Sequence, residues 1–330
     1  MDIKFIETEV ADYNVTQQQA ESIWSKLSEI RYFEEKSIEA YKQGLLGGSL
    51  HPYIGQEAVA TGIGEFINES DYMTTTYRGR GHALAKGADP FKLFAEMFGR
   101  VDGYCKGKGG PMHIANSDLG MLGANGIVAG GIPIAVGAAI TAKSMNKGQV
   151  AITYFGDGAT NQGVFHEAMN LAAIMKLPVI FICENNLYSE MTPIKDSVLN
   201  EHLAERGLAY RIPSYVVDGN DVFAVRKVAK LAIEFARNGD GPVFIEAKTY
   251  RLLGHMFGDT EIYRTKEEVN SWIDKEPLKQ FKRRMLESNI LSEEKLDEIE
   301  ESVKILIDDA FERAKKSEQP GFEEVYTDVY

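Results

Sequence analysis

The residues best suited to chemistry form two polar groups, and each group directly follows an apolar, β-branched run. Residues 156–158 (GDG) follow the run that ends at Phe155, and residues 184–188 (ENNLY) follow the next such run. One strand–helix–strand unit fills the interval between Asp157 and Asn186. Because the carboxyl ends of parallel strands meet at the same edge of a sheet, we expect the two groups to lie close together.

These residue types fit a magnesium ion that carries a diphosphate. Magnesium prefers oxygen ligands and is commonly held by one or two protein groups together with substrate phosphates and water. Asp157 can supply one oxygen, while the adjacent glycines and a helix that begins near Asn161 offer backbone N–H groups to phosphates. Gly-Asp-Gly alone is also ordinary turn chemistry. Its pairing with Asn-Asn at the next strand end is more specific.

Other nucleotide-binding patterns are missing. No G-x-G-x-x-G opens the first helix after a strand, and no GxxxxGK[ST] is present. A nicotinamide dinucleotide fold is therefore disfavoured, since the acidic residue here falls inside the glycine turn.

Composition excludes several classes of protein. The chain has 330 residues, 44% of them hydrophobic, and 36 basic against 49 acidic residues give a net charge of -13, which would repel nucleic acid or an anionic membrane. No window is apolar over the length that a bilayer crossing requires, and the first residues lack a signal-peptide pattern. We expect a cytoplasmic protein with neither nucleic acid nor membrane as partner. Cys105 and Cys183 lie outside any ligand cluster, and we expect both to be buried.

Alternating strands and helices must position these groups. We expect the strands at 149–155, 178–183, 214–217 and 242–247, and the helices between them at 165–175 and 222–237. This alternation predicts an α/β fold with a mostly parallel sheet, helices on both faces and ligands at the carboxyl ends of the strands.

Further helices are expected at both ends of the chain and around a polar connection. The helical ranges are 16–44, 56–66, 90–98 and the charged region 266–316, which Pro277 interrupts. The connection TTTYRGRGH (74–82) is a candidate anion-binding loop, and the glycine-rich segment 103–131 is expected to approach a ligand closely. We divide the chain into an N-terminal helical extension (1–50), a main domain (51–265) and a C-terminal helical region of the same unit (266–330).

The segment GDGATNQGVFHEAMNLAAIMKLPVIFICENNLY (156–188) resembles the thiamine diphosphate motif in the α subunits of 2-oxo acid dehydrogenase E1 components and of acetoin dehydrogenase. Four further segments resemble this family in the family's order: HPYIGQEA, GYCKGKGGPMHI, GANGIVAGGIPIAVGAA and YRLLGHMFGDTEIYR. The resemblance implies the thiamine diphosphate-binding fold, with thiamine diphosphate and Mg²⁺ as cofactors. It covers roughly residues 20–315, a span typical of one or two packed domains.

The resemblance also implies roles for individual residues. The side chains of Asp157 and Asn186 and the main-chain carbonyl of Tyr188 would bind magnesium. In the GDG turn and directly after it, Gly156, Gly158 and Ala159 would contact the diphosphate end of the cofactor. Tyr77 and Arg78 match a phosphate-binding Tyr-Arg pair of the family. The backbone of Gly126 and Val128 would touch the aminopyrimidine ring.

Two histidines match active-site positions of the family. His51 and His255 would bind the diphosphate, the substrate or an intermediate, and imidazole suits proton transfers near neutral pH. The other four histidines are expected to have structural roles: His82, His113, His166 and His202. Around His255, we expect Arg251, Asp259 and Arg264 to order the loop, with solvated surface charge as the alternative.

Two positions depart from the family's patterns. Met256 stands directly after His255, where the phosphorylation-controlled members carry serine, so that form of control is not expected. Glu190 occupies a position that is apolar in pyruvate-type relatives. Together with the glycine-rich segments, it favours acetoin-type relatives.

The family activates its cofactor through a glutamate on a separate β subunit. The resemblance therefore implies an E1 α subunit in an α2β2 heterotetramer, which acts on a 2-oxo acid such as pyruvate, or on acetoin, and transfers the acyl group to the lipoyl arm of an E2 acyltransferase. Two alternatives stay open. One is a split transketolase half, and the other is a non-catalytic binding protein with the same fold.

Overall fold

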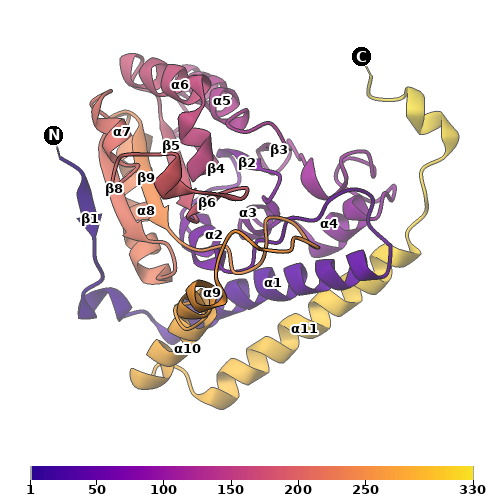
Figure 1. Ribbon diagram of the computed structural model, residues 1–330. Helices are drawn as coiled ribbons and strands as arrows, with labels where there is room; N and C mark the ends of the chain where they lie inside the picture. The colour runs from indigo at the N-terminus through magenta and orange to yellow at the C-terminus, as the bar shows by residue number, and fades with distance from the viewer. Residues whose placement is uncertain (1, 330) are drawn as a thin grey trace.

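A seven-stranded, fully parallel sheet lies at the centre of the structure, a computed structural model that describes residues 2–329 (Figure 1). The strand order is β1-β8-β9-β5-β4-β2-β3. The strands are β1 (Lys4–Ile6), β2 (Tyr72–Thr76), β3 (Met121–Asn125), β4 (Ala151–Gly156), β5 (Val179–Asn185), β8 (Ser214–Asp218) and β9 (Val243–Lys248). The predicted parallel α/β fold is confirmed, and the four predicted strands are β4, β5, β8 and β9.

Eleven α-helices occur within residues 2–329, and they confirm the helices expected from the sequence. Pro277 interrupts the last helical region as predicted, because it occupies the first turn of α10. The helices are α1 (Gln17–Lys42), α2 (Glu57–Gly64), α3 (Arg80–Ala85), α4 (Pro90–Met97), α5 (Gly131–Met145), α6 (Gly163–Ile174), α7 (Glu205–Leu208), α8 (Val222–Arg237), α9 (Lys266–Ile273), α10 (Pro277–Glu287) and α11 (Glu293–Lys316).

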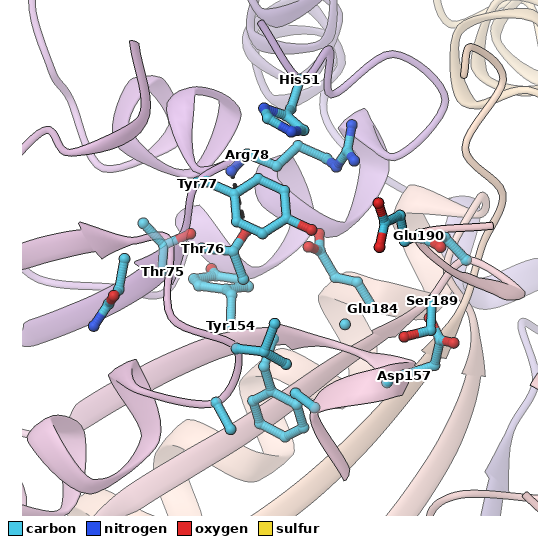
Figure 2. Close-up of a pocket in the computed structure, with 18 of the residues that line it drawn as sticks. His51, Thr75, Thr76, Tyr77, Arg78, Tyr154, Asp157, Glu184, Ser189 and Glu190 are labelled. Atoms are coloured by element: carbon cyan, nitrogen blue, oxygen red, sulfur yellow. Dashed lines mark hydrogen bonds between the residues drawn. The ribbon is translucent and has the colours of Figure 1, made fainter. Parts of the chain in front are cut away.

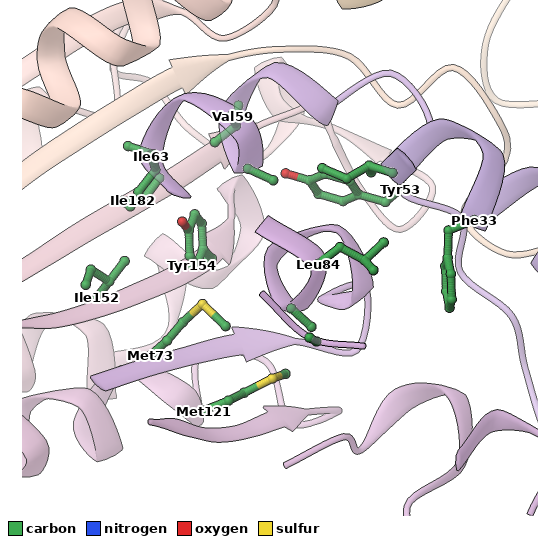
Figure 3. Close-up of a cluster of buried hydrophobic side chains, with 14 of the residues drawn as sticks. Phe33, Tyr53, Val59, Ile63, Met73, Leu84, Met121, Ile152, Tyr154 and Ile182 are labelled. Carbon is green, nitrogen blue, oxygen red and sulfur yellow. The ribbon is translucent and has the colours of Figure 1, made fainter. Parts of the chain in front are cut away.

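Helices cover both faces of the sheet because its central strands are buried on both sides. In β4, Ile152 and Tyr154 pack into the core that α1, α2, α4, α8 and α11 cover, whereas Ala151 and Phe155 pack into the core beneath α5 and α6. Figure 3 shows the first of these cores around Tyr154. Fully buried parallel strands read as continuous apolar runs, which is why the sequence revealed them.

The two ends of the chain share a core. Helix α1 begins at a capping box formed by Thr16 and Gln19 and packs alongside α11 (Figure 1). Trp24 Nε1 donates to the carbonyl oxygen of Leu296 at 2.9 Å. The domain boundaries that we drew at residues 50 and 265 remain a prediction.

Two expectations were wrong in detail. The connection 74–82 is not a loop throughout, because Thr74–Thr76 complete β2 and Arg80 begins α3. Cys183 is buried as expected, but Cys105 is only partly buried. The close approach of the glycine-rich segment to a ligand remains a prediction. In its early part, Glu96 accepts N–H bonds from four residues: Cys105, Gly107, Gly109 and Gly110.

No helix within residues 2–329 is long and apolar enough to cross a membrane. Strands β1, β2 and β3 escaped prediction because they are short, and β2 and β3 are rich in Thr, Gly and Asn. In β2 the polar side chains are paired inside the fold: Thr74 Oγ1 bonds Thr153 Oγ1 at 2.9 Å.

Candidate functional site

A cavity of about 540 Å³ opens at the carboxyl ends of β2, β3, β4 and β5 (Figure 2). All twelve site residues predicted from the sequence line it, although they come from segments far apart in the chain. They are His51, Tyr77, Arg78, Gly126, Val128, Gly156, Asp157, Gly158, Ala159, Asn186, Tyr188 and His255. The structure therefore brings the whole predicted set together, while the role of each residue remains a prediction.

One oxygen of the Asp157 carboxylate has no hydrogen-bond partner at the end of β4. Its side chain is buried, with only 1% of the residue exposed, and Oδ2 accepts no hydrogen bond. Burial, the largest cause, raises the pKa of Asp157 to about 6. A buried carboxylate oxygen without a donor is unfavourable unless a cation or a hydrogen bond satisfies it. This oxygen therefore fits a bound cation.

The turn that follows Asp157 leaves no space for a side chain at Gly158. A Cβ atom built there would lie 1.8 Å from Oγ of Ser189. Ser189 belongs to a short hairpin, β6 (Tyr188–Ser189) and β7 (Thr192–Pro193), that leaves β5 and overhangs the cavity. The glycine thus lets the turn after β4 approach this hairpin closely.

Asn186 follows β5, the parallel neighbour of β4, and lines the same cavity as Asp157. Its Nδ2 donates to Oε1 of Gln56 at 3.1 Å, and its Oδ1 accepts only a long bond of 3.4 Å from the backbone N–H of Tyr188. The buried Nε2 of Gln56 has no partner. Our sequence analysis missed Gln56 as a site residue, although it lies in the segment HPYIGQEA.

Within residues 2–329, no group of three or more His, Cys, Asp or Glu side chains could hold a metal ion. A cation in this cavity would therefore depend on one carboxylate, amide or carbonyl oxygens and the oxygens of a ligand. Magnesium commonly binds proteins in this way, with few protein ligands and substrate phosphates in its coordination shell. The donor set around Asp157 and Asn186 fits such an ion.

Three aromatic rings cluster at the other end of the cavity. The His51 ring lies 4.9 Å from that of His255 and 4.6 Å from that of Tyr77, measured between centroids. Burial, followed by the positive charge of Arg78, lowers the pKa of His51 to about 3 and that of His255 to about 4. Both imidazoles are therefore neutral at pH 7.

The tautomer of His255 follows from its contact with Arg251. Nη1 of Arg251 lies 3.2 Å from Nδ1 of His255, and a guanidinium can only donate. Nδ1 is therefore the acceptor, and the proton of the neutral ring resides on Nε2. His51 differs, because its Nδ1 is buried and has no partner.

Arg78 joins the two loops that carry these histidines. Its guanidinium donates to the carbonyl oxygens of Pro52 and His255, the second at 3.1 Å. Burial lowers its pKa to about 10, so it stays charged at neutral pH. The residue that we predicted to bind phosphate thus also fixes the relative positions of His51 and His255.

Arg251, Asp259 and Arg264 hold the loop around His255 in place, as expected from the sequence. Asp259 accepts bonds from the backbone N–H of His255 at 2.8 Å and from the hydroxyl of Tyr263 at 2.7 Å. Arg251 and Arg264 are 1% and 8% exposed, so the alternative of solvated surface charge is wrong for both.

The floor of the cavity contains a buried network that our sequence analysis did not identify. Nε2 of His82 lies 3.0 Å from Oε1 of Glu184, and its Nδ1 lies 2.7 Å from Oγ1 of Thr75. The ring of His82 stacks on Tyr154 at 3.7 Å. Glu184, Thr75 and Tyr154 line the cavity, and only the position of Glu184 at the start of ENNLY hinted at this.

Comparison of the sequence with known proteins gives matches along nearly the whole chain. The family model described as dehydrogenase E1 component matches residues 25–323. The chain is 46% identical over 318 residues to the α subunit of acetoin:2,6-dichlorophenolindophenol oxidoreductase from Bacillus subtilis, covering 96% of this chain and 95% of the relative. The corresponding subunit from Cupriavidus necator is 43% identical over 310 residues, with 94% and 93% covered.

A pyruvate dehydrogenase E1 component subunit alpha, from Zymomonas mobilis, is 39% identical over 319 residues and covers 96% of this chain and 90% of its own. The resemblance predicted from the motifs is therefore confirmed along nearly the whole sequence. The chain belongs to the dehydrogenase E1 component family.

Proposed function

We propose that this chain is the α subunit of a heteromeric, thiamine diphosphate-dependent E1 enzyme that cleaves the carbon–carbon bond next to a carbonyl. Its substrate would be pyruvate, another 2-oxo acid or acetoin, and the acyl group would pass to the lipoyl arm of an E2 acyltransferase. One observation carries the proposal. A single cavity contains all twelve predicted residues and presents the unpartnered carboxylate oxygen of Asp157.

In this proposal the two ends of the cavity have different tasks. Asp157, Asn186 and the main-chain carbonyl of Tyr188 would hold Mg²⁺, and the backbone N–H groups of Gly158 and Ala159 would meet the diphosphate. The buried, unpartnered oxygen of Asp157 and the weakly occupied Oδ1 of Asn186 support this assignment.

Thiamine diphosphate would supply the carbon nucleophile for the substrate carbonyl. This chain would provide the proton-handling groups beside it. His255 carries its proton on Nε2 and can donate from that atom, whereas the neutral His51 ring has a free Nδ1. Because both pKa values are low, neither ring holds a positive charge before it accepts a proton.

The names of the relatives support a β partner, and we propose that two α and two β chains form the enzyme. Ile127 and Val128 line the cavity and are 74% and 49% exposed, so apolar surface surrounds the site in the isolated chain. A β subunit that contributes the activating glutamate would cover this surface.

Reconstitution tests the proposal. The purified chain should show little turnover alone and gain activity when mixed with its β partner, thiamine diphosphate and Mg²⁺, with reduction of dichlorophenolindophenol as the readout. Asp157→Asn should reduce Mg²⁺-dependent cofactor affinity by roughly 100-fold, since even indirect metal contacts are worth 10- to 100-fold. Asp309→Asn, an exposed carboxylate on α11, is the matched control.

If Asp157→Asn bound the cofactor and turned over like the wild type, the metal assignment would fail. A non-catalytic protein with this fold would bind cofactor in the mixture without turnover. The split transketolase half is disfavoured by the family match over residues 25–323.

A further inference from the structure

The hairpin that overhangs the cavity carries a carboxylate at its tip. Glu190 lies in the two-residue turn between β6 and β7 and has a left-handed backbone, with φ of 55°. Nη2 of Arg251 donates to its carbonyl oxygen at 2.8 Å, and this bond fixes the turn. Figure 2 shows the Glu190 carboxylate directed from the hairpin into the cavity, which it lines.

This carboxylate has no counterion. Among residues 2–329, its side chain forms neither an ion pair nor a hydrogen bond, and the bond to Arg251 involves the main chain. The guanidinium of Arg251 is instead shared between this carbonyl, His255 and Tyr263. Arg78 donates to two carbonyl oxygens.

The two other acidic side chains that line the cavity, Glu184 and Asp157, have partners or an assigned cation. Oε1 of Glu184 is bonded by His82 and by the hydroxyl of Tyr53. Asp157 lies at the cofactor end, where a metal ion would neutralise it. Glu190 therefore supplies the uncompensated negative charge of the cavity in this chain.

A negative charge at this place would discriminate between the two classes of substrate. A 2-oxo acid enters as an anion and is repelled by a carboxylate at close range, whereas a neutral hydroxyketone is not. Without the Glu190 charge, the nearby guanidinium of Arg251 would dominate this part of the cavity and would attract a substrate carboxylate.

We propose that Glu190 is a specificity-determining residue that disfavours anionic 2-oxo acids and thereby selects a neutral α-hydroxyketone, the chemical class of acetoin. The inference rests on the proposed function, because it concerns the substrate of the same site.

The test uses the reconstituted α and β chains with thiamine diphosphate and Mg²⁺. We expect the wild type to have a higher kcat/KM for acetoin than for pyruvate. Glu190→Gln lowers this ratio about tenfold, the equivalent of about 1.4 kcal/mol, chiefly because kcat/KM for pyruvate rises. Added salt should raise kcat/KM for pyruvate in the wild type more than in the variant, since Glu190 is exposed in this chain and salt screens an exposed charge.

Glu201→Gln is the control, because Glu201 is an exposed carboxylate with 86% side-chain exposure and does not line the cavity. The pair Glu190→Asp and Glu190→Asn repeats the test with residues that tolerate left-handed backbone and differ in charge. The charged variant should keep the wild-type preference, and the neutral one should lose it.

The possible failures are separable. A wild-type preference for pyruvate, or an unchanged ratio in both neutral variants, overturns the inference and leaves the proposed function intact. A wild-type pair that acts on neither class of carbonyl substrate refutes the proposed function itself.

Discussion

The close approach of Gly158 to Ser189 couples the turn after β4 to the hairpin after β5. In Gly158→Ala, the new methyl group would lie 1.8 Å from Oγ and 2.7 Å from Cβ of Ser189. The backbone of Gly158 is not left-handed, so alanine can adopt its conformation. The only cost of the substitution is therefore the steric contact with Ser189. Overpacking of this kind costs about 1–3 kcal/mol.

Relief of this contact must displace either the hairpin or the turn that carries Asp157. Ser189, at the base of the hairpin, and Asp157, in the turn, lie at the end of the cavity that we assign to the diphosphate. If about 2 kcal/mol of the cost falls on the cofactor complex, the affinity for thiamine diphosphate decreases roughly 30-fold. Ser189→Gly removes both clashing atoms and leaves only its Cα, 3.7 Å from the new methyl group.

Isothermal titration of the reconstituted pair with thiamine diphosphate in excess Mg²⁺ measures this effect. Gly158→Ala should bind weakly, and the double variant with Ser189→Gly should recover most of the loss. Gly163→Ala is the matched control, because nothing lies within 4 Å of a Cβ at that position. Wild-type affinity in Gly158→Ala, or a double variant no better than the single one, would refute the reasoning.

Two further predictions concern stability. Arg80 forms a buried, two-point ion pair with Glu34, so Arg80→Met should lower the free energy of unfolding by about 3–5 kcal/mol, as measured by urea unfolding. The double variant Arg80→Met with Glu34→Met should lose less free energy of unfolding than the sum of the losses in the two single variants. The neutral ring of His51 contributes stability above its ordinary pKa of 6.5 that is lost as pH falls toward 3, because the unfolded chain then binds a proton that the folded chain excludes. Between pH 7 and 5, the free energy of unfolding of the wild type should therefore decrease by about 1 kcal/mol more than that of His51→Asn, after allowance for solvent screening. Equal decreases in the two proteins would contradict the low pKa of His51.

The sequence predicted those parts of the fold in which local pattern and burial agree. Strands β4 and β5 are long apolar runs that the sheet buries on both faces, and α8 matches its predicted range residue for residue. Strand β2 was missed because its threonines are polar in sequence and become satisfied only when Thr74 meets Thr153. Helix α5 was missed because its first half contains Gly131, Pro133 and Gly137, residue types that disfavour a helix.

The twelve predicted residues that line the cavity were readable from the sequence, since each of them lies in a motif that resembles the family. The electrostatic and hydrogen-bonding interactions between those residues were not readable from the sequence. The low pKa values of His51 and His255 arise from burial and from Arg78, which lies on a different segment. Gln56 joined the site only through its bond to Asn186, 130 positions away.

By itself, the sequence determined the parallel α/β architecture and the segments that carry the cofactor motif, because hydrophobic periodicity and motif spacing are local properties. Only the tertiary structure decided that the oxygen of Asp157 is left without a partner, that the proton of His255 resides on Nε2, and that the charge of Glu190 has no counterion. Hydrogen bonds and electrostatic fields depend on which distant residues pack together, and that information exists only once the chain has folded.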